Sequence, residues 1–437
     1  MKGNNKDQKA ILNKMGIKQL NEMQSEAITT IASNPEVILL SPTGSGKTLA
    51  FLLPIIAELD PIIDQVQTLI LVPSRELAIQ IEQVTREMGS GFKVNAVYGG
   101  RSGSKDKLEL KHAPAILIGT PGRIADHFRR ETIDTECIKT LVLDEFDKSL
   151  EIGFENEMKE ILQTLTRVEK KVLTSATQKA EIPNFIELKD PKRLDFLSEE
   201  SSSLTLKSVI SPDKDKLQTL HQLLLQLGDQ SGIVFCNFKD TIQFVSDYLS
   251  EKGIQHGCFY GGLEQVDRER ALIKFRNGTH KILIATDLAA RGIDVPEMDY
   301  IVHYQLPHKK EEFVHRNGRT ARMNTNGTAY ILQWEEETVP DFIDAPAIFE
   351  LKDNASNPSM EWDTIYISGG RKDKISKGDI AGLFFKQGNL GKNELGIIEL
   401  KQDCAFVAVP RKKAGAIAEQ LNNSRLKSKK VRISVLK

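Results

Sequence analysis

The sequence Ser-Pro-Thr-Gly-Ser-Gly-Lys-Thr at residues 41–48 is the most informative feature of this chain. It follows the apolar run 37–40 and precedes the helix-prone residues 48–58, as in a strand, a phosphate-binding loop and a helix. A glycine-rich turn without a ligand is the less favoured interpretation, because both the Gly-Lys-Thr ending and the strand–helix context match. The loop therefore predicts binding of a nucleoside triphosphate through Thr43, Gly44, Ser45, Gly46, Lys47 and Thr48.

Composition limits the class of protein. The 437 residues are 40% hydrophobic and 27% charged, which predicts a soluble globular protein of two or three domains. No apolar run approaches the roughly 18 residues needed to cross a bilayer, and residues 1–10 are polar and unlike a signal peptide. Four cysteines lie far apart, so neither a zinc site nor a disulfide framework is indicated. We expect a cytosolic protein with reduced thiols.

Charge is distributed unevenly along the chain. Residues 361–437 carry 16 Lys and Arg against 8 Asp and Glu, whereas residues 1–360 carry 43 against 52. A basic module attached to an acidic body suggests a nucleic acid or another polyanion as partner. A solvated basic face without a ligand is the alternative.

Two similar halves precede the basic module. In residues 36–177 and again in residues 232–332, short runs rich in Val, Ile and Leu alternate with helical segments. This alternation predicts two α/β lobes, each with a parallel sheet covered on both faces. Residues 198–203 and 353–359 are polar and are predicted to be a hinge and a linker. The predicted limits are 1–203 for the first lobe, 204–350 for the second lobe, 351–360 for the linker and 361–437 for the basic module.

A second chemical motif is Asp144-Glu145-Phe146-Asp147, directly after the apolar run 141–143. Ligands of open α/β sheets bind at the carboxyl ends of strands, where both this cluster and the phosphate loop are expected. Asp144 can hold Mg²⁺ through water, and Glu145 can orient and deprotonate an attacking water. Together with the loop, the cluster predicts phosphoryl transfer to water.

The third motif lies in the second lobe and reads His-Arg-Asn-Gly-Arg-Thr-Ala-Arg, residues 315–322. A spacing of three places Arg319 and Arg322 on one side of a helix or its end. If the two lobes close, these guanidinium groups can stabilise charge on the γ-phosphate. A solvated arginine-rich helix end is the alternative. If both guanidinium groups reach the γ-phosphate, nucleotide binding would be coupled to closure of the two lobes.

The ordered set of motifs resembles the DEAD-box ATP-dependent RNA helicases of superfamily 2 over nearly the whole chain. The matching positions are Gln24, 41–48, Pro-Ser-Arg-Glu-Leu-Ala at 73–78, Gly-Gly at 99–100, Thr-Pro-Gly-Arg at 120–123, 144–147, Ser-Ala-Thr at 175–177, Gln265 with Arg268, Ala-Thr-Asp at 285–287, Arg-Gly-Ile-Asp at 291–294 and 315–322. The resemblance implies two RecA-like lobes, ATP and Mg²⁺ as cofactors, and local unwinding driven by lobe closure.

The resemblance also implies roles for individual residues. Gln24 would bind the edge of the adenine base, and Asp294 would bind the ribose. Lys47 and Thr48 would bind the phosphates and the metal ion, which Asp144 would also hold. The residues expected to couple ATP to strand separation are Asp147, Ser175 and Thr177. Those expected to line the RNA path are Arg75, Gly100, Thr120 and Arg123 in the first lobe and Gln265, Arg268 and Thr286 in the second.

Three positions depart from the family pattern. Phe146 stands where the family has Ala, residues 1–23 lack the usual aromatic upstream of Gln24, and Ala321 replaces a Gly. A bulky ring at position 146 needs space near the ATP site, and a missing aromatic can loosen nucleotide selectivity.

The basic module predicts the order β-α-β-β-α-β, typical of a small RRM-like α+β domain. Residues 404–409 lack a row of aromatics, and Tyr366 is the clearest aromatic on the first strand. We therefore expect RNA to be held mainly by basic residues and loops. The candidates are Tyr366, Arg371, Lys372, Lys374, Arg411, Lys412, Lys413 and residues 425–432.

Residues 377–380, 395–398 and 406–411 of this module resemble the C-terminal domain of the bacterial DbpA-type helicases. That resemblance implies docking on a hairpin of large-subunit ribosomal RNA and a role in ribosome assembly. Related domains also occur in CsdA-type cold-shock helicases. We therefore expect a monomeric, cytoplasmic RNA-dependent ATPase that remodels short RNA duplexes. The alternatives are a general cold-shock or mRNA-remodelling helicase, and a nucleotide-gated RNA clamp with little turnover.

Overall fold

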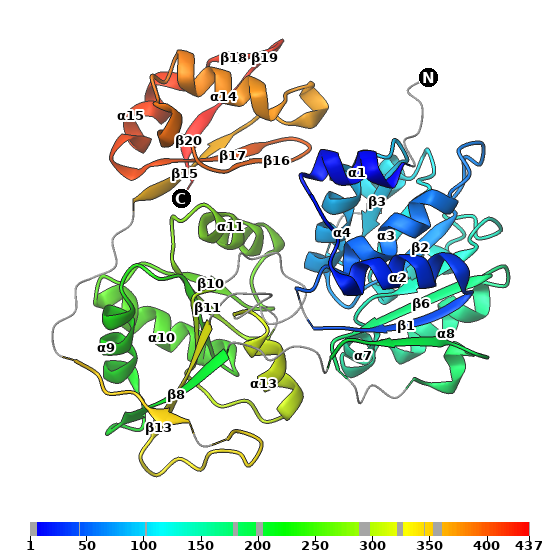
Figure 1. Ribbon diagram of the computed structural model, residues 1–437. Coiled ribbons are helices and arrows are strands. Elements are labelled where there is room, and N and C mark those ends of the chain that lie inside the picture. The colour runs from blue at the N-terminus through cyan, green and yellow to red at the C-terminus, as the bar shows by residue number, and fades with distance from the viewer. Residues whose placement is uncertain are drawn as a thin grey trace. The chain divides into compact units, whose positions relative to one another are not determined.

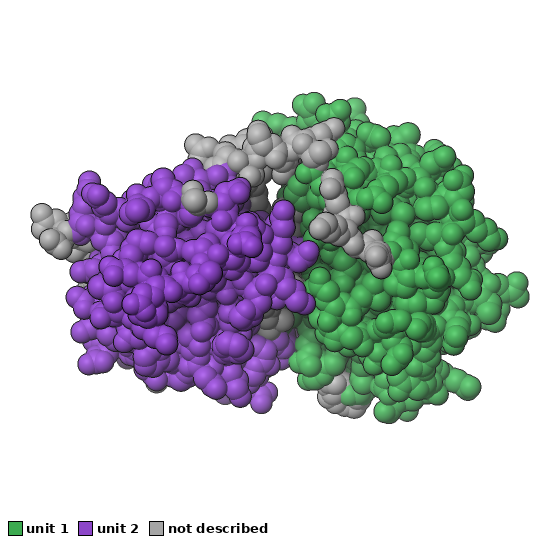
Figure 2. Space-filling model, turned by 90° about the horizontal axis from the view of Figure 1, so that it is seen from below, with its two compact units in different colours: residues 1–202, 291–294 green, residues 203–290, 295–437 purple. Residues whose placement is uncertain are grey.

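The computed structural model describes residues 7–42, 44–100, 103–177, 182–197, 204–287, 298–320, 327–344, 346–352 and 361–436, without the side chains of residues 104 and 105. The described residues before position 203 form one compact unit, and those after it form a second, as Figure 2 shows by colour. The predicted hinge at 198–203 and linker at 353–359 lie outside the described residues.

The first unit contains a seven-stranded sheet in which all described pairings are parallel. Its order is β3-β4-β2-β5-β6-β1-β7. Figure 1 labels β1, β2, β3 and β6 of this sheet. The strands are β1 Glu36–Leu40, β2 Thr68–Leu71, β3 Val94–Val97, β4 Ile116–Gly119, β5 Thr140–Leu143, β6 Lys170–Ser175 and β7 Lys192–Asp195. The inner strands are apolar and buried along nearly their whole length, as expected for a parallel sheet with both faces covered.

Successive side chains of β1 point into two separate cores, which shows how the helices are divided. Val37 and Leu39 join the core formed with α1 to α4, whereas Ile38 and Leu40 join the core formed with α6 and α8. The helices of this unit are α1 Gln8–Met15, α2 Glu22–Ser33, α3 Lys47–Glu58, α4 Arg75–Met88, α5 Gly103–Glu109, α6 Pro121–Arg129, α7 Phe146–Glu151, α8 Glu155–Thr164 and the short η1 Asn184–Ile186.

The second unit begins with another parallel sheet of seven strands in the order β10-β11-β9-β12-β13-β8-β14. The predicted pair of α/β lobes is thereby confirmed. The strands are β8 Leu204–Ser211, β9 Gly232–Phe235, β10 Gly257–Phe259, β11 Ile282–Ala285, β12 Tyr300–His303, β13 Gly327–Trp334 and β14 Ala347–Ile348. The helices are α9 Leu217–Leu227, α10 Lys239–Glu251, α11 Gln265–Arg276 and α13 Lys310–Asn317.

The basic module forms a four-stranded antiparallel sheet in the order β16-β17-β15-β20. Its elements are β15 Trp362–Ile367, η2 Arg371–Asp373, α14 Lys377–Lys386, η3 Lys392–Glu394, β16 Ile398–Leu400, β17 Ala405–Pro410, α15 Arg411–Leu421, β18 Arg425–Leu426, β19 Lys429–Lys430 and β20 Ile433–Val435. The predicted β-α-β-β-α-β order is confirmed. The hairpin of β18 and β19 was not predicted. It is formed by residues of the basic run 425–432.

The two faces of this small sheet have different neighbours. Ile365, Val407 and other inward residues pack with α14 and α15. On the opposite face, Phe406 and Tyr366 form a cluster with Ile273 of α11 in the second lobe. At the edge of that contact, the Arg276 guanidinium donates to both carboxylate oxygens of Glu399, at 2.6 and 2.8 Å.

Candidate functional site

The phosphate loop connects the carboxyl end of β1 to the start of α3. Gly44 and Gly46 both have φ of 88°, in the left-handed region that favours glycine. Gly46 is the N-cap of α3, and as a glycine it has no side chain to accept a hydrogen bond from the first turn of the helix. The N–H groups of that turn are therefore available to an anion, which the helix dipole also favours.

Lys47 occupies a buried position at the start of α3. Its ammonium donates to the carbonyl oxygens of Ser41 at 2.5 Å and Pro42 at 2.7 Å. Burial lowers the pKa of Lys47 to about 8, although the Asp144 and Glu145 carboxylates oppose this shift. A polyphosphate in the loop would supply the negative charge that this buried cation lacks.

Asp144 and Glu145 follow β5, and Thr174 of the neighbouring strand β6 binds both of them. The Thr174 hydroxyl donates to the Asp144 carboxylate and accepts from the Glu145 backbone N–H at 3.1 Å. Burial and, second, the charge of Glu145 raise the pKa of Asp144 to about 6. A buried acid held in this way fits a divalent cation, whose charge would stabilise the carboxylate. Sequence reasoning missed Thr174, because its partner lies 30 positions away.

Lys148 is a second buried cation near these acids, and sequence reasoning missed it as well. Its side chain is fully buried, and its ammonium lies 3.0 Å from a carboxylate oxygen of Glu145, three residues earlier in the chain. Glu145 itself has φ of 51°, so the backbone turns sharply between β5 and α7. The spacing of three between opposite charges was the available signal.

Phe146 does not lie among the acidic side chains. Its ring is 1% exposed and belongs to the apolar core that also contains Ile124 of α6 and Ile161 of α8. The departure from the family pattern at position 146 is therefore absorbed by the core on this face of the sheet.

The three predicted coupling residues lie together at the ends of β5 and β6. The Thr177 hydroxyl donates to Asp147 at 3.1 Å, and the Thr177 backbone N–H donates to the Ser175 hydroxyl at 3.0 Å. Burial raises the pKa of Asp147. One hydrogen-bonded group thus joins the acidic cluster to the residues that follow β6.

Gln24 is attached to the phosphate loop through the start of α2. Its backbone N–H donates to Asn21 at 2.7 Å, and its side-chain oxygen accepts from the Asn21 backbone at 3.1 Å, which forms a capping box. The Gln24 amide lies 3.4 Å from the Gly46 carbonyl, and the Asn21 amide donates to the Ser45 carbonyl at 3.0 Å. Sequence reasoning missed Asn21, although Asn followed three residues later by Gln is a capping signal.

The residues predicted to line the RNA path in the first unit follow the neighbouring strands β3, β4 and β2. Arg75 begins α4, and a Cβ at Gly100 would lie 2.5 Å from its guanidinium, so the glycine permits a close approach. Thr120 is the N-cap of α6, and Arg123 lies in the first turn of that helix. The carboxyl edge of three strands therefore carries Arg75, Gly100, Thr120 and Arg123.

The corresponding residues of the second unit lie on α11 and at the end of β11. Arg268 is buried and donates to the Gln265 side chain at 2.5 Å. Thr286 follows β11 directly, and Arg319 is buried two residues after α13. Thr43, Asp294 and Arg322 lie outside the described residues, as do Ala321 and residues 291–293.

The candidate RNA contacts of the basic module occupy different surroundings. Tyr366 is half-buried, with its ring centroid 5.7 Å from that of Phe406. Arg411 is exposed at the start of α15 but donates to Gln255 of the second lobe at 2.7 Å. The exposed Lys372 and Lys412 have no ion pair within the described part of the chain.

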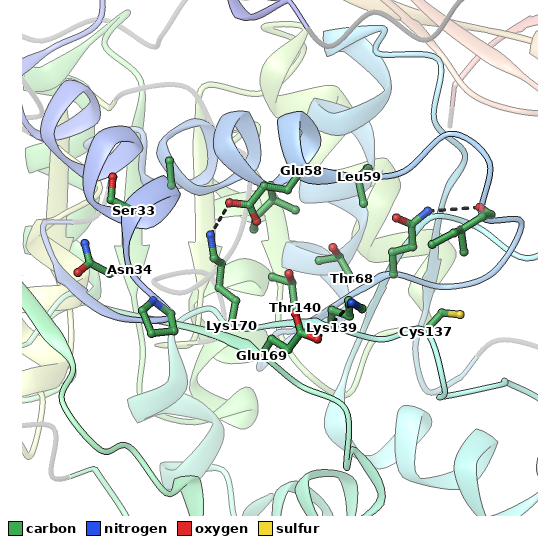
Figure 3. Close-up of a pocket in the computed structure, with 15 residues that line it drawn as sticks. Ser33, Asn34, Glu58, Leu59, Thr68, Cys137, Lys139, Thr140, Glu169 and Lys170 are labelled. Atoms are coloured by element: carbon green, nitrogen blue, oxygen red, sulfur yellow. Dashed lines mark hydrogen bonds and ion pairs between the residues drawn. The ribbon is translucent and has the colours of Figure 1, made fainter.

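A cavity of about 400 Å³ lies at the other end of the first sheet, where β2, β5 and β6 begin (Figure 3). The Lys170 ammonium donates to the Ile31 carbonyl at 2.7 Å and to Glu58, and Lys139 lies 3.1 Å from Glu169. Because its cations are paired, this cavity offers no free charge for a polyphosphate.

The described residues provide neither a membrane span nor a ready-made cluster of metal-binding side chains. None of the helices there is long and apolar enough to cross a membrane. That part of the chain also holds no cluster of three or more His, Cys, Asp or Glu side chains arranged to bind a metal ion.

Comparison with protein families gives three matches. The DEAD/DEAH box helicase family matches residues 21–185, the helicase conserved C-terminal domain matches residues 215–324, and the DbpA RNA binding domain matches residues 364–435. The ATP-dependent RNA helicase DbpA of Escherichia coli is 32% identical over 98% of this chain and 96% of its own. The Bacillus subtilis protein of the same name is 28% identical over 96% and 95%.

Solved structures with a similar fold include two proteins bound to RNA and a nucleotide analogue. S. cerevisiae Dbp5 bound to RNA and ADP BeF3 has a TM-score of 0.66 and 27% identity, over 75% of this chain and 86% of that one. Mss116p bound to ssRNA and AMP-PNP has a TM-score of 0.68 and 26% identity, over 76% and 73%.

Proposed function

Because the chain belongs to the DEAD-box family of ATP-dependent RNA helicases, we propose that it hydrolyses ATP in response to RNA and locally unwinds short RNA duplexes. The observation that carries this proposal is the arrangement around β6. The phosphate loop follows the neighbour of β6 on one side, and the acidic cluster follows its neighbour on the other. Thr174 of β6 holds both Asp144 and Glu145, so one strand organises the two acids that hydrolysis needs.

In the proposed reaction, Lys47 and the first turn of α3 bind the phosphates, and Glu145 orients the attacking water and accepts its proton. Thr48 and Asp144 would hold Mg²⁺, which when bound neutralises charge on the phosphate oxygens. The remaining contacts with ATP are assigned to Gln24 for the base, Asp294 for the ribose, and Arg319 and Arg322 for the γ-phosphate.

RNA is proposed to bind along the carboxyl edges of both sheets. Arginines, hydroxyls and glycine N–H groups suit a sugar–phosphate backbone read without base specificity. Asp147, Ser175 and Thr177 would transmit closure between the ATP site and this path, since they are already linked to each other. The proposed RNA contacts are Arg75, Gly100, Thr120, Arg123, Gln265, Arg268 and Thr286.

The basic module is proposed to direct the enzyme to ribosomal RNA during assembly of the large ribosomal subunit, as a monomer in the cytoplasm. Its match to the DbpA RNA binding domain and its basic charge support this assignment. The proposed contacts are Tyr366, Arg371, Lys372, Arg411 and Lys412. The proposed domain limits remain 1–203, 204–350 and 361–437, with a linker at 351–360.

Stimulation of the ATPase by different RNAs tests the targeting. We expect half-maximal stimulation at a much lower concentration of large-subunit ribosomal RNA, or of a hairpin from it, than of unrelated RNA of equal length. Equal stimulation by all three RNAs would favour the general cold-shock or mRNA-remodelling helicase.

A single-turnover measurement tests hydrolysis itself. With RNA present, the wild-type protein should release phosphate, and Glu145→Gln should retain ATP binding but lose this release, because the amide is a far weaker base. If the wild-type protein binds RNA and ATP without releasing phosphate, the nucleotide-gated clamp is the better description.

A further inference from the structure

Asp106 is a fully buried acid for which the proposed reaction has no use. It lies on α5, six residues after Gly100 of the predicted RNA path. A charge in the interior is unfavourable unless other charges and hydrogen bonds compensate it. The partners of Asp106 therefore indicate why the acid is there.

One partner of Asp106 is Arg123, which lies in the first turn of α6. One oxygen of Asp106 accepts from the Nε of Arg123 at 2.9 Å and from its Nη2 at 2.7 Å. The same oxygen lies 3.3 Å from Nε2 of His127, one helical turn later. The Nη1 group of the Arg123 guanidinium donates to a second carboxylate, that of Asp126, at 3.0 Å.

These contacts fix the guanidinium and leave part of it available. A guanidinium has five N–H groups, and the two carboxylates use three of them. One N–H on each terminal nitrogen remains, and such a pair can bind two oxygens of a phosphate at once. The Arg123 side chain is 17% exposed, so part of it reaches the surface.

Asp106 also joins two parts of the predicted RNA path. Gly100 lies against the Arg75 guanidinium, and α5 begins three residues later. At the first residue of α5, a Cβ on Gly103 would lie 3.4 Å from the Nη2 of Arg123. The bond between Asp106 and Arg123 thus attaches α5 to α6.

We propose that Asp106 is a positioning residue for RNA binding: it holds the guanidinium of Arg123 in the orientation that receives an RNA phosphate. This inference rests on the proposed function, in which Arg123 contacts the RNA backbone. In this inference Asp106 does not touch RNA, and its effect on RNA binding is transmitted through Arg123.

The experiment uses the full chain and RNA-stimulated ATPase activity. Asp106→Asn keeps the size of the side chain but removes the charge that binds the guanidinium. We expect the RNA concentration for half-maximal stimulation to rise about tenfold, while kcat at saturating RNA and the RNA-free rate stay unchanged. Asp126→Asn is the matched control, with a smaller rise, because Asp126 holds one N–H of Arg123 where Asp106 holds two.

A double mutant separates positioning from general structure. In an Arg123→Ala background, Asp106→Asn should not raise the RNA concentration for half-maximal stimulation any further, because the guanidinium that Asp106 positions is no longer present. A rise of the same size in both backgrounds would overturn the inference. Arg123→Lys keeps the positive charge but removes the planar guanidinium, and it should weaken RNA binding as Asp106→Asn does. This variant therefore still tests the inference if Asp106→Asn fails to fold.

Two further outcomes distinguish this inference from the proposed function. If Arg123→Ala and Arg123→Lys leave half-saturation unchanged while RNA still stimulates the wild-type protein, the inference fails and the helicase assignment stands. If RNA does not stimulate the wild-type protein at all, the proposed function fails and this inference fails with it.

Discussion

Replacing Thr174 with valine should disable the acidic cluster without changing the shape of the core. The side chain is fully buried on β6, and valine has nearly the same volume. The substitution removes the donor to Asp144 and the acceptor for the Glu145 backbone N–H. Asp144 and Glu145 then lose the contact that sets their relative positions.

The size of the effect follows from these two hydrogen bonds. A hydrogen bond to a charged group contributes about 1.5–3 kcal/mol, and a buried N–H left without an acceptor costs about 1–3 kcal/mol. Because the two effects share one side chain and partial relaxation is expected, we take about 3 kcal/mol for the loss of stability of the first unit. The ATPase rate should fall about 10- to 100-fold, the usual cost of losing a residue that orients ligands of a metal.

The assay is RNA-stimulated ATP hydrolysis together with thermal unfolding followed by circular dichroism. The two tryptophans lie at positions 334 and 362, so tryptophan fluorescence would report on the second unit only. Thr174→Ser is the control, since it keeps the hydroxyl and should retain most of the activity. Wild-type hydrolysis and stability in Thr174→Val would refute the role given to this strand.

Three other predictions follow from the same geometry. Lys47→Ala should abolish ATP binding, measured by equilibrium titration, because the loop loses its buried cation; unchanged affinity would contradict the site. Removing residues 361–437 should lower selectivity among RNAs and spare RNA-free hydrolysis, and equal selectivity before and after truncation would defeat the targeting proposal. Asp144→Asn should stabilise the nucleotide-free and metal-free protein near pH 7.5 by about 1–3 kcal/mol. The native pKa of Asp144, about 6, lies above its ordinary value of 3.8, so this group's contribution to stability falls as pH rises between those values. The advantage of the variant should therefore disappear near pH 4, and a pH-independent difference in melting temperature would contradict this reasoning.

The two sheets and the phosphate loop were predictable because their signals are local. Residues 37–48 contain the strand, the loop and the start of the helix in one continuous stretch, and the same alternation recurs along both lobes. The edge strands β7, β10 and β14 and the inner strand β8 were missed. β7 carries Lys192, Arg193 and Asp195, and β14 has only two residues, so neither has the apolar run that marks an inner strand.

Contacts between neighbouring strands were not predictable from spacing. Thr174 meets Asp144 only because β6 lies beside β5, and Asp106 meets Arg123 only because α5 and α6 flank β4 in the chain. In both cases the motif residue was recognised and its partner was not. A sequence motif contains the residues that contact the ligand. The residues that orient them are brought close by the fold, and their distance along the chain follows no fixed pattern.

The aromatic residues on the small sheet of the basic module also have a role that depends on packing. The sequence predicted that this sheet lacks a row of stacking aromatics, and the structure gives a physical reason. Its open face packs Phe406 and Tyr366 against Ile273 of α11, and the ion pair of Arg276 with Glu399 borders this contact. Since α11 also carries Gln265 and Arg268 of the proposed RNA path, aromatic residues on this face serve the junction with the second lobe. Base stacking on the same face would require that junction to open. Among the proposed contacts, the exposed Lys372 and Lys412 are therefore better candidates for binding RNA than Tyr366.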